Sequence, residues 1–133
     1  MPSFPPRHVF VYGTLRMGQA NDINRLQPAP RFVARARLAG TMYHLGGYPG
    51  VLLGGTQTVV GEVYAIDAAL ERVMDEIEEI YPQQRDEYRK REIAVSVDGQ
   101  GVQGQQLLCL VYEINARYVS DRPEIAGGDW LNR

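Results

Sequence analysis

The chain has 133 residues, of which 44% are hydrophobic and 23% are charged, and its formal net charge at pH 7 is −2. The length predicts a single domain over residues 1–133, and the composition is that of a folded protein with its own core, which excludes a disordered chain. The small net charge gives no reason to expect nucleic acid or an anionic membrane as a partner, and no stretch resembles a membrane-spanning helix or a signal peptide, so we expect a cytoplasmic protein.

The N-terminal part of the chain predicts a strand followed by a loop. Residues 8–12 are rich in β-branched and aromatic side chains and are followed by a glycine, as at the end of a strand. Residues 13–21 form a segment rich in turn residues, and residues 22–26 predict a short helical turn that Pro28 ends.

The middle of the chain predicts further strands. Residues 32–45 alternate enough to hold one or two strands, and the glycine-rich residues 46–50 predict a tight connection. Residues 59–66 predict another strand, in which Gly61 marks a bulge or a close approach of two backbones.

Residues 67–80 are the clearest helix of the sequence. Asp67 suits the N-cap position, and Pro82 follows the helix. The spacing i, i+3, i+4, i+7 predicts a core-facing stripe of Leu70, Val73, Met74 and Ile77.

A hairpin is predicted after the helix. Ile93, Val95 and Val97 alternate as in a strand, residues 98–101 form a turn, and the apolar residues 107–114 supply the second strand. The tally is about six strands and one good helix. Strands in succession with tight turns favour an antiparallel sheet or a closed barrel over alternating βαβ units.

Several catalytic chemistries are excluded by what the sequence lacks. There is no Gly-x-Ser-x-Gly motif, the two histidines have no metal-binding spacing, and no glycine-rich loop fits a nucleotide site. We therefore expect neither a metal nor another cofactor. The single cysteine, Cys109, lies in an apolar run and is predicted to be a core residue.

Carboxylates on the predicted helix are the first candidates for chemistry. At about 100° per residue, Asp75 and Glu79 point almost opposite the apolar stripe, whereas Glu71, Glu76 and Glu78 lie near its margins. A carboxylate at the margin can face a cleft, where partial burial raises its pKa toward the range that a general base needs. Geometry alone leaves these three residues open.

The loop after the first strand is the second candidate. A strand that ends in Gly13-Thr14, with Gly18 shortly after, can leave several backbone N–H groups unpaired. Such groups would bind a carboxylate or a developing oxyanion in a cavity. The alternative is an ordinary turn at the end of a strand.

Residues 9–21, Val-Phe-Val-Tyr-Gly-Thr-Leu-Arg-Met-Gly-Gln-Ala-Asn, resemble the opening of the gamma-glutamylcyclotransferase-like proteins. Within that family they are most similar to the gamma-glutamylamine cyclotransferase-like and AIG2-like subgroup. Further matches follow in order: Gly47-Tyr48-Pro49-Gly50, Gly61-Glu62-Val63-Tyr64, Met74-Asp75-Glu76-Ile77-Glu78, Tyr88-Arg89-Lys90-Arg91 and Gly128-Asp129-Trp130.

The resemblance implies an α+β fold, a small mixed and largely antiparallel β-barrel with one principal helix, short flanking helices and a cavity beside the first loop. It also selects Glu78 as the counterpart of the family's catalytic glutamate. The backbone amides of Gly13, Thr14 and Leu15 would bind substrate, and Tyr12 and Tyr88 are expected to line the cavity.

The expected activity is that of a cyclotransferase. The α-amine of a small γ-glutamyl amide attacks the side-chain carbonyl, which releases an amine or amino acid and forms pyroglutamate (5-oxoproline), while Glu78 transfers the proton. The chain would act as a monomer or a homodimer. Two alternatives stay open: the scaffold acts on a γ-glutamyl group of a larger metabolite or carrier, or it is a non-catalytic module that binds a small molecule.

Overall fold

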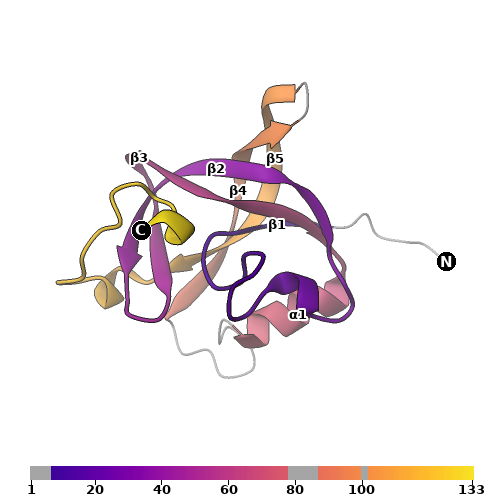
Figure 1. Ribbon diagram of the computed structural model, residues 1–133, viewed down its shortest axis with the longest axis horizontal. Helices are drawn as coiled ribbons and strands as arrows, with labels where there is room; N and C mark the ends of the chain where they lie inside the picture. The colour runs from indigo at the N-terminus through magenta and orange to yellow at the C-terminus, as the bar shows by residue number, and fades with distance from the viewer. Residues whose placement is uncertain (1–6, 78–86, 100–101) are drawn as a thin grey trace.

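The structure is a computed structural model that describes residues 7–77, 87–99 and 102–133 (Figure 1). The strands are β1 (Arg7–Val11), β2 (Arg31–His44), β3 (Pro49–Ile66), β4 (Tyr88–Gly99) and β5 (Val102–Ile114). The helices are α1 (Ala68–Ile77) and three short 3₁₀ turns, η1 (Ile23–Arg25), η2 (Ala116–Tyr118) and η3 (Trp130–Asn132). Figure 1 shows α1 below the strands and the C-terminal segment on the other side of the molecule.

The strands form a closed barrel in the order β1-β3-β2-β4-β5. All neighbours are antiparallel except β1 and β5, which pair in parallel at Val9 and Leu110 and so close the barrel. A closed barrel leaves no unpaired sheet edge. The expected mixed, largely antiparallel barrel with one principal helix is therefore confirmed.

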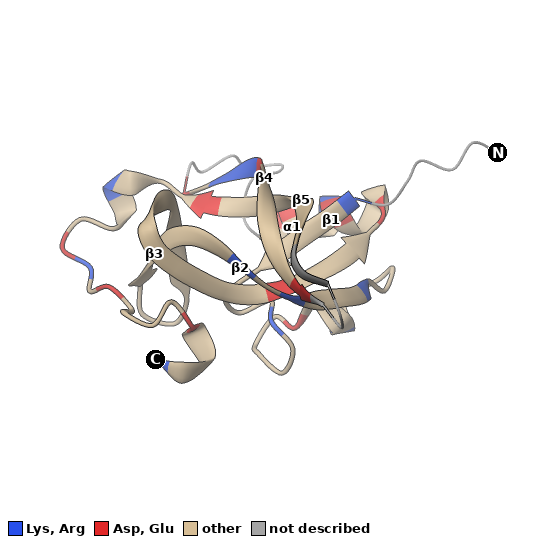
Figure 2. Ribbon diagram, turned by 90° about the horizontal axis from the view of Figure 1, so that it is seen from above, with Lys and Arg blue, Asp and Glu red and all other residues tan. Residues whose placement is uncertain are grey.

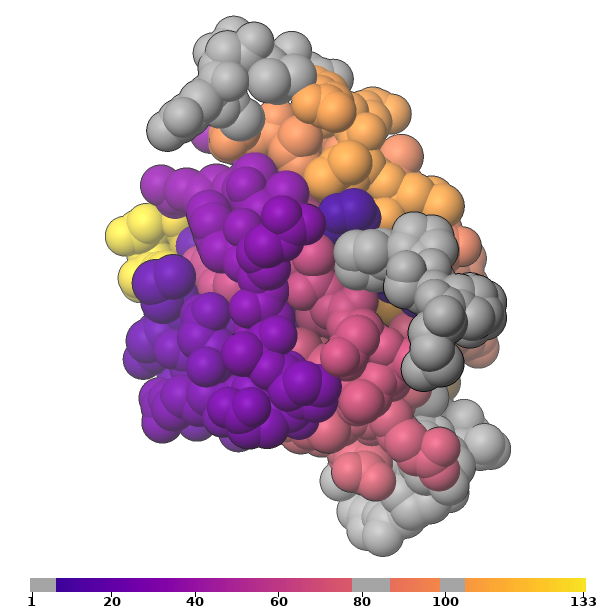
Figure 3. Space-filling model, turned by 90° about the vertical axis from the view of Figure 1, so that its right-hand side faces the viewer, coloured from indigo at the N-terminus to yellow at the C-terminus, as the bar shows by residue number. Residues whose placement is uncertain are grey.

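Strand β1 is buried on both of its faces. Phe10 and Tyr12 belong to a core cluster that includes residues from every strand, whereas Val9 and Val11 belong to a second cluster beneath α1 and η1. Because side chains alternate along a strand, one strand can supply both clusters. Figure 3 shows the early part of the chain, in indigo and purple, packed beside the pink region that contains α1.

Several local predictions are confirmed. The turn at residues 22–26 is η1, and residues 93–97 and 107–114 belong to the β4–β5 hairpin. The carboxylate of Asp67 accepts a hydrogen bond of 2.8 Å from the N–H of Leu70, as an N-cap does. Leu70 and Met74 of the predicted stripe are fully buried, and α1 is described to Ile77, so residues 78–80 and Pro82 lie outside the described residues.

The described residues contain five strands rather than about six, because residues 31–44 form one strand, β2, where the sequence left room for two. Strand β3 is longer than predicted and begins at residue 49 rather than at residue 59. Its pairing with β2 jumps from Ala39↔Thr58 to Gly40↔Leu53, so residues 54–57 have no partner in β2. Gly54 and Gly55 both have positive φ angles there. This irregular, exposed stretch interrupts the alternation of side chains, which is why only the second half of β3 was recognisable in the sequence.

Gly61 permits the close approach that its sequence context suggested. A Cβ atom at this position would lie 2.3 Å from the carbonyl oxygen of Val11 and 2.5 Å from the ring of Phe10. Only glycine fits, so this position sets how closely β1 and β3 pack just before the loop.

Charged residues of both signs are interspersed along the described chain (Figure 2). None of the helices in the described part has the length and apolar character needed to cross a membrane.

Candidate active site

A cavity of about 370 Å³ opens at the end of β1, next to the end of α1. Small-molecule sites are concave and mostly apolar, with a few polar groups that orient the ligand. The described residues that line this cavity are Phe10, Val11, Tyr12, Gly13, Thr14, Leu15, Ala20, Asn21, Gly47, Tyr48, Pro49, Ile77, Glu87, Tyr88 and Tyr112.

The loop at Gly13, Thr14 and Leu15 has its carbonyl groups engaged within the loop itself. They accept hydrogen bonds from the N–H groups of Arg16 at 3.0 Å, Asn21 at 2.8 Å and Ile23 at 2.9 Å, respectively. The N–H groups of residues 13–15 are not donors in any hydrogen bond found among the described residues. A short run of such amides beside a cavity is suited to an anion, either a carboxylate or an oxyanion.

The first residue of this loop must be glycine for steric reasons. A Cβ atom on Gly13 would lie 2.6 and 2.7 Å from two ring carbons of Pro49, which lines the same cavity. Real Cβ atoms do not approach other atoms so closely, so a side chain here would push the loop and the β2–β3 turn apart. At Gly47, by contrast, no atom of the described residues lies within 4 Å of the Cβ position.

A buried ionic cluster of Arg16, Glu62 and Asp129 holds the loop from behind, and we call it the loop-side cluster. The Arg16 side chain is 2% exposed; its Nε donates to Glu62 Oε2 at 3.0 Å and its Nη1 to Asp129 Oδ1 at 2.9 Å. Glu62 Oε1 also accepts from the N–H of Met17 at 3.1 Å and from the hydroxyl of Tyr64 at 2.8 Å. Because both carboxylates are paired, the cluster fixes the path of the loop.

The pKa of Asp129 is lowered from its ordinary value. Burial by itself would raise this pKa, but hydrogen bonds from Asn132, Arg16 and Leu131 to the carboxylate outweigh that effect. The carboxylate is therefore stabilised in its charged form beside Arg16.

Asp22 fixes the second half of the loop in a similar way. Its two carboxylate oxygens accept from the N–H of Gly18 at 2.8 Å and from the N–H of Asn24 at 2.9 Å. Burial would raise the pKa of Asp22, but these hydrogen bonds dominate and leave it lowered.

Tyrosine side chains form much of the cavity wall. The hydroxyl of Tyr12 donates to the carbonyl oxygen of Tyr112 at 2.6 Å, and that of Tyr88 donates to the carbonyl oxygen of Pro49 at 2.8 Å. The rings of Tyr48 and Tyr88 lie 6.5 Å apart between centroids. These contacts join β1, β3, β4 and β5 around the cavity, so its shape depends on the closed barrel.

The other side of the cavity is held by Lys90, Asp75 and Glu71, which we call the helix-side cluster. The Nζ of Lys90 donates to Asp75 Oδ2 at 2.9 Å and to Glu71 Oε2 at 2.6 Å. The hydroxyl of Tyr112 donates to Asp75 Oδ1 at 2.7 Å. Burial would lower the pKa of Lys90, but the two carboxylates outweigh burial and raise it.

The position of Asp75 differs from the one that helical geometry alone suggested. A helical projection puts Asp75 almost opposite the apolar stripe, yet its side chain is only 14% exposed and accepts hydrogen bonds from Lys90 and Tyr112. The reason is tertiary: β4 and β5 supply these partners on a side of α1 that a helical projection treats as open.

The structure brings together the residues predicted to bind substrate, since Tyr12, Gly13, Thr14, Leu15 and Tyr88 all line this one cavity. Glu78, predicted to be catalytic, lies outside the described residues, as does Glu79. The two other carboxylates left open by geometry do not line the cavity: Glu71 is bonded to Arg7 and Lys90, and Glu76 is exposed.

Sequence reasoning gave no role to three cavity residues: Tyr48, Glu87 and Tyr112. Tyr48 lies in a motif shared with the family, but nothing assigned it to the cavity. Glu87 directly precedes the Tyr88 motif and carried no signal of its own. Tyr112 lies in the apolar run of residues 107–114, which predicts a strand and no site. Cys109 is a core residue as predicted, since it is fully buried and burial raises its pKa to about 12.

The fold and the cavity define a small closed β-barrel with a cavity between the loop after its first strand and its principal helix. The chain belongs to the family described as Gamma-glutamyl cyclotransferase, AIG2-like, whose model matches residues 9–132. The resemblance found in the sequence motifs is thereby confirmed.

Individual relatives agree with this assignment. The chain is 34% identical to Gamma-glutamylaminecyclotransferase of Bos taurus over 116 residues, 78% of this chain and 63% of that protein. It is 39% identical to Gamma-L-glutamyl-butirosin B gamma-glutamyl cyclotransferase of Niallia circulans over 75 residues, 56% of this chain and 47% of that protein. The matches thus cover about half to two thirds of these curated relatives.

A solved structure shows the same fold. The crystal structure of an AIG2-like protein from Mus musculus superposes with a TM-score of 0.73 at 25% sequence identity, covering 90% of this chain and 86% of that one.

Proposed function

We propose that this protein is a cyclotransferase that releases an amine or amino acid from a γ-glutamyl amide and forms pyroglutamate. The observation that carries the proposal is that the amide-rich loop at residues 13–15 and the end of α1 at Ile77 line one small cavity. Family membership and the names of the relatives support the same activity.

The reaction needs no nucleophile from the protein. The substrate's α-amine attacks its own δ-carbonyl carbon, a C–N bond forms, and the C–N bond to the leaving amine breaks. One proton passes from the attacking nitrogen to the leaving nitrogen, so atoms and charges balance without water. Because the attacking amine and the carbonyl already belong to one molecule, the protein only has to hold the glutamyl group in a folded conformer that brings them into contact.

The loop amides of Gly13, Thr14 and Leu15 bind a negatively charged oxygen of the substrate in this proposal, either the α-carboxylate or the oxyanion of the tetrahedral intermediate. Tyr12 and Tyr88 pack against the glutamyl group. The loop is suited to this role because the loop-side cluster holds it in one conformation before substrate arrives, which lowers the cost of ordering it.

Glu78 is the proposed proton carrier, acting as base toward the attacking amine and then as acid toward the leaving nitrogen. Two facts support this choice over the other helix carboxylates. Glu78 directly follows Ile77, which lines the cavity, and consecutive Cα atoms are about 3.8 Å apart. Glu71 is bonded to Arg7 and Lys90, and Glu76 is exposed and does not line the cavity.

The test is to incubate the protein with a panel of γ-glutamyl amines and γ-glutamyl dipeptides and to measure pyroglutamate by mass spectrometry. Glu78→Gln should lower kcat by about 10²–10⁴-fold, the usual contribution of a general acid–base. Glu76→Gln is the matched control, since it removes an exposed carboxylate two residues earlier and should leave kcat within about twofold. Full activity in a folded Glu78→Gln variant would contradict the mechanism.

A further inference from the structure

We propose that the preferred substrate is a γ-glutamyl amide whose leaving amine carries a second, positively charged group, and that Glu87 together with the rings of Tyr48 and Tyr88 binds that cation. This inference rests on the proposed cyclotransferase activity and names the substrate class for it.

The charge of the cavity wall is the first observation. Among the described residues that line the cavity, Glu87 alone carries a formal charge, and no lysine, arginine or histidine is among them. The loop amides supply partial positive charge for one anionic group of the substrate. The carboxylate of Glu87 has no cationic side chain as its partner among the hydrogen bonds and ion pairs of the described chain, so its charge is available to a ligand.

The position of this carboxylate is fixed by its neighbours. The hydroxyl of Tyr48 donates to Glu87 Oε2 at 2.5 Å, which leaves Oε1 for another donor. The backbone carbonyl of Glu87 accepts from the N–H of Asn115 at 2.8 Å, which ties its main chain to the end of β5. A carboxylate held in this way loses little freedom when it binds an ammonium group.

Aromatic rings complete a site with the chemistry of a cation receptor. The rings of Tyr48 and Tyr88 lie 6.5 Å apart at 50° to one another, and both line the cavity beside Glu87. An ammonium group is attracted to the face of an aromatic ring and to a carboxylate, and the two attractions add when the group is partly desolvated.

This wall is connected to the anion-binding loop through Pro49. Gly13 packs against the ring of Pro49, and Tyr88 donates to the carbonyl oxygen of the same residue. One substrate can therefore meet both regions, with its carboxylate at the loop and a cationic leaving group at Glu87. A leaving group with its own carboxylate, as in a γ-glutamyl amino acid, would face repulsion at Glu87.

The experiment compares three substrates of similar length, the γ-glutamyl derivatives of 1,4-diaminobutane, pentylamine and 4-aminobutanoate, by the rate of pyroglutamate formation. We expect kcat/KM for the cationic diaminobutane derivative to exceed that for the neutral pentylamine derivative by about tenfold, with the anionic derivative slowest. Glu87→Gln should bring the ratio of the first two close to one.

The matched control is Glu124→Gln, which removes an exposed carboxylate that contacts Gln57 and does not line the cavity, and which should retain the ratio. A second readout needs no variant: raising the ionic strength should reduce the ratio in the unaltered protein, because salt screens a charge pair near the surface. A merely structural role for Glu87 would not produce this change.

The outcomes separate the two proposals. Pyroglutamate formed equally well from the cationic and the neutral derivative would overturn the cation site and leave the cyclotransferase activity in place. The same holds for a preference that survives both Glu87→Gln and high salt. Failure of all three derivatives to yield pyroglutamate would contradict the proposed function and with it this inference.

Discussion

The two ionic clusters beside the cavity differ in how deeply they are buried. In the loop-side cluster the Arg16 side chain is 2% exposed and Glu62 is 8% exposed. In the helix-side cluster the Lys90 side chain is 26% exposed, and Glu71 also pairs with Arg7, which is 49% exposed. The cation of the loop-side cluster is therefore enclosed by the protein, whereas the cations of the helix-side cluster are partly open to solvent.

The difference indicates that the two clusters hold the two sides of the cavity in different ways. A guanidinium with carboxylates on two sides has fixed, directional hydrogen bonds, whereas an ammonium on a four-carbon stem can follow small movements of its partners. The loop proposed to bind an anion is thus held by directional contacts, and the end of α1 at Ile77 is held by contacts that can adjust.

The largest effect is expected from Arg16→Met. The substitution leaves the buried Glu62 and the partly buried Asp129 without their cation, and breaking a buried ion pair in this way costs about 3–5 kcal/mol of unfolding free energy. Urea denaturation of the variant and the unaltered protein measures the difference.

The control for Arg16 is Arg37→Met, which breaks the exposed pair between Arg37 and Asp98 at 3.6 Å. Exposed pairs contribute little, so this change should stay within about 1 kcal/mol. Equal losses in the two variants would show that burial does not distinguish the clusters.

Gly13→Ala should damage the loop side next most. Its Cβ atom would meet the ring of Pro49 at 2.6 Å, and relief of such overlap typically costs about 1–3 kcal/mol. Because the displaced atoms line the cavity, KM should rise as well. Gly127→Ala provides the control, since no atom in the described part of the chain lies within 4 Å of its Cβ position, and it should change neither stability nor KM noticeably. An unchanged KM in Gly13→Ala would argue against the loop as a substrate-binding element.

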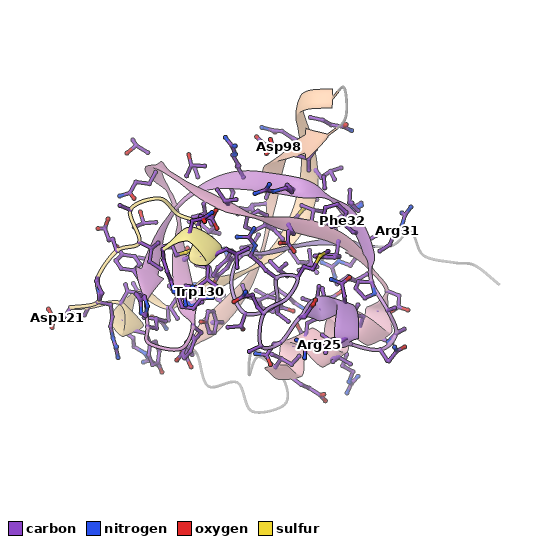
Figure 4. All side chains as sticks on the ribbon, viewed as in Figure 1. Arg25, Arg31, Phe32, Asp98, Asp121 and Trp130 are labelled. Atoms are coloured by element: carbon purple, nitrogen blue, oxygen red, sulfur yellow. The ribbon has the colours of Figure 1, made fainter. Side chains whose placement is uncertain are left out.

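Asp75→Asn should have a smaller effect, on the helix side. The amide retains an acceptor for Tyr112 but loses its charge toward Lys90, and a hydrogen bond to a charged group contributes about 1.5–3 kcal/mol when buried and less here. We expect kcat to fall several-fold because the end of α1 shifts. Asp98→Asn, at the far end of the β4–β5 hairpin (Figure 4), is the control and should leave kcat unchanged.

The smallest effect is expected in the pH dependence of the free energy of unfolding, in which the two clusters should differ. The pKa of Asp129 is lower in the folded protein than in the unfolded chain, where it is about 3.9, so the ionised carboxylate stabilises the fold at pH values above about 3.9. This stabilisation is lost as the pH falls through the pKa of the folded state. The pKa of Lys90 is higher in the folded protein than in the unfolded chain, where it is about 10.4, so the charged ammonium stabilises the fold at pH values below about 10.4. This stabilisation is lost as the pH rises through the pKa of the folded state.

Unfolding curves across pH therefore give a specific check on the two clusters. Asp129→Asn should flatten the acid limb, and Lys90→Met should flatten the alkaline limb. A variant that flattens the opposite limb would contradict the assignment of these shifts.

Local patterns predicted much of the fold and part of the site. The cap at Asp67, the apolar stripe of α1 and the β4–β5 hairpin depend on neighbours in sequence, and all three are present. The loop at residues 13–15 was recognisable because its glycines and its motif are contiguous.

Contacts between distant segments could not be predicted in the same way. Arg16 meets Glu62 and Asp129, which lie 46 and 113 residues away, and no local pattern connects them. Glu87 and Tyr112 reach the cavity only because the barrel closes, and Asp75 is covered by strands that a helical projection does not include. The residues proposed to bind substrate were therefore easier to predict than those that hold them in place.

Gly47 offers a way to alter which molecules the cavity admits. It lines the cavity, its φ is not in the left-handed region, and no described residue lies within 4 Å of its Cβ position. A larger side chain there would take up space in the cavity without displacing a described neighbour or changing the amides at residues 13–15. Related proteins that differ at this one position could thus share the same chemistry while accepting leaving groups of different width.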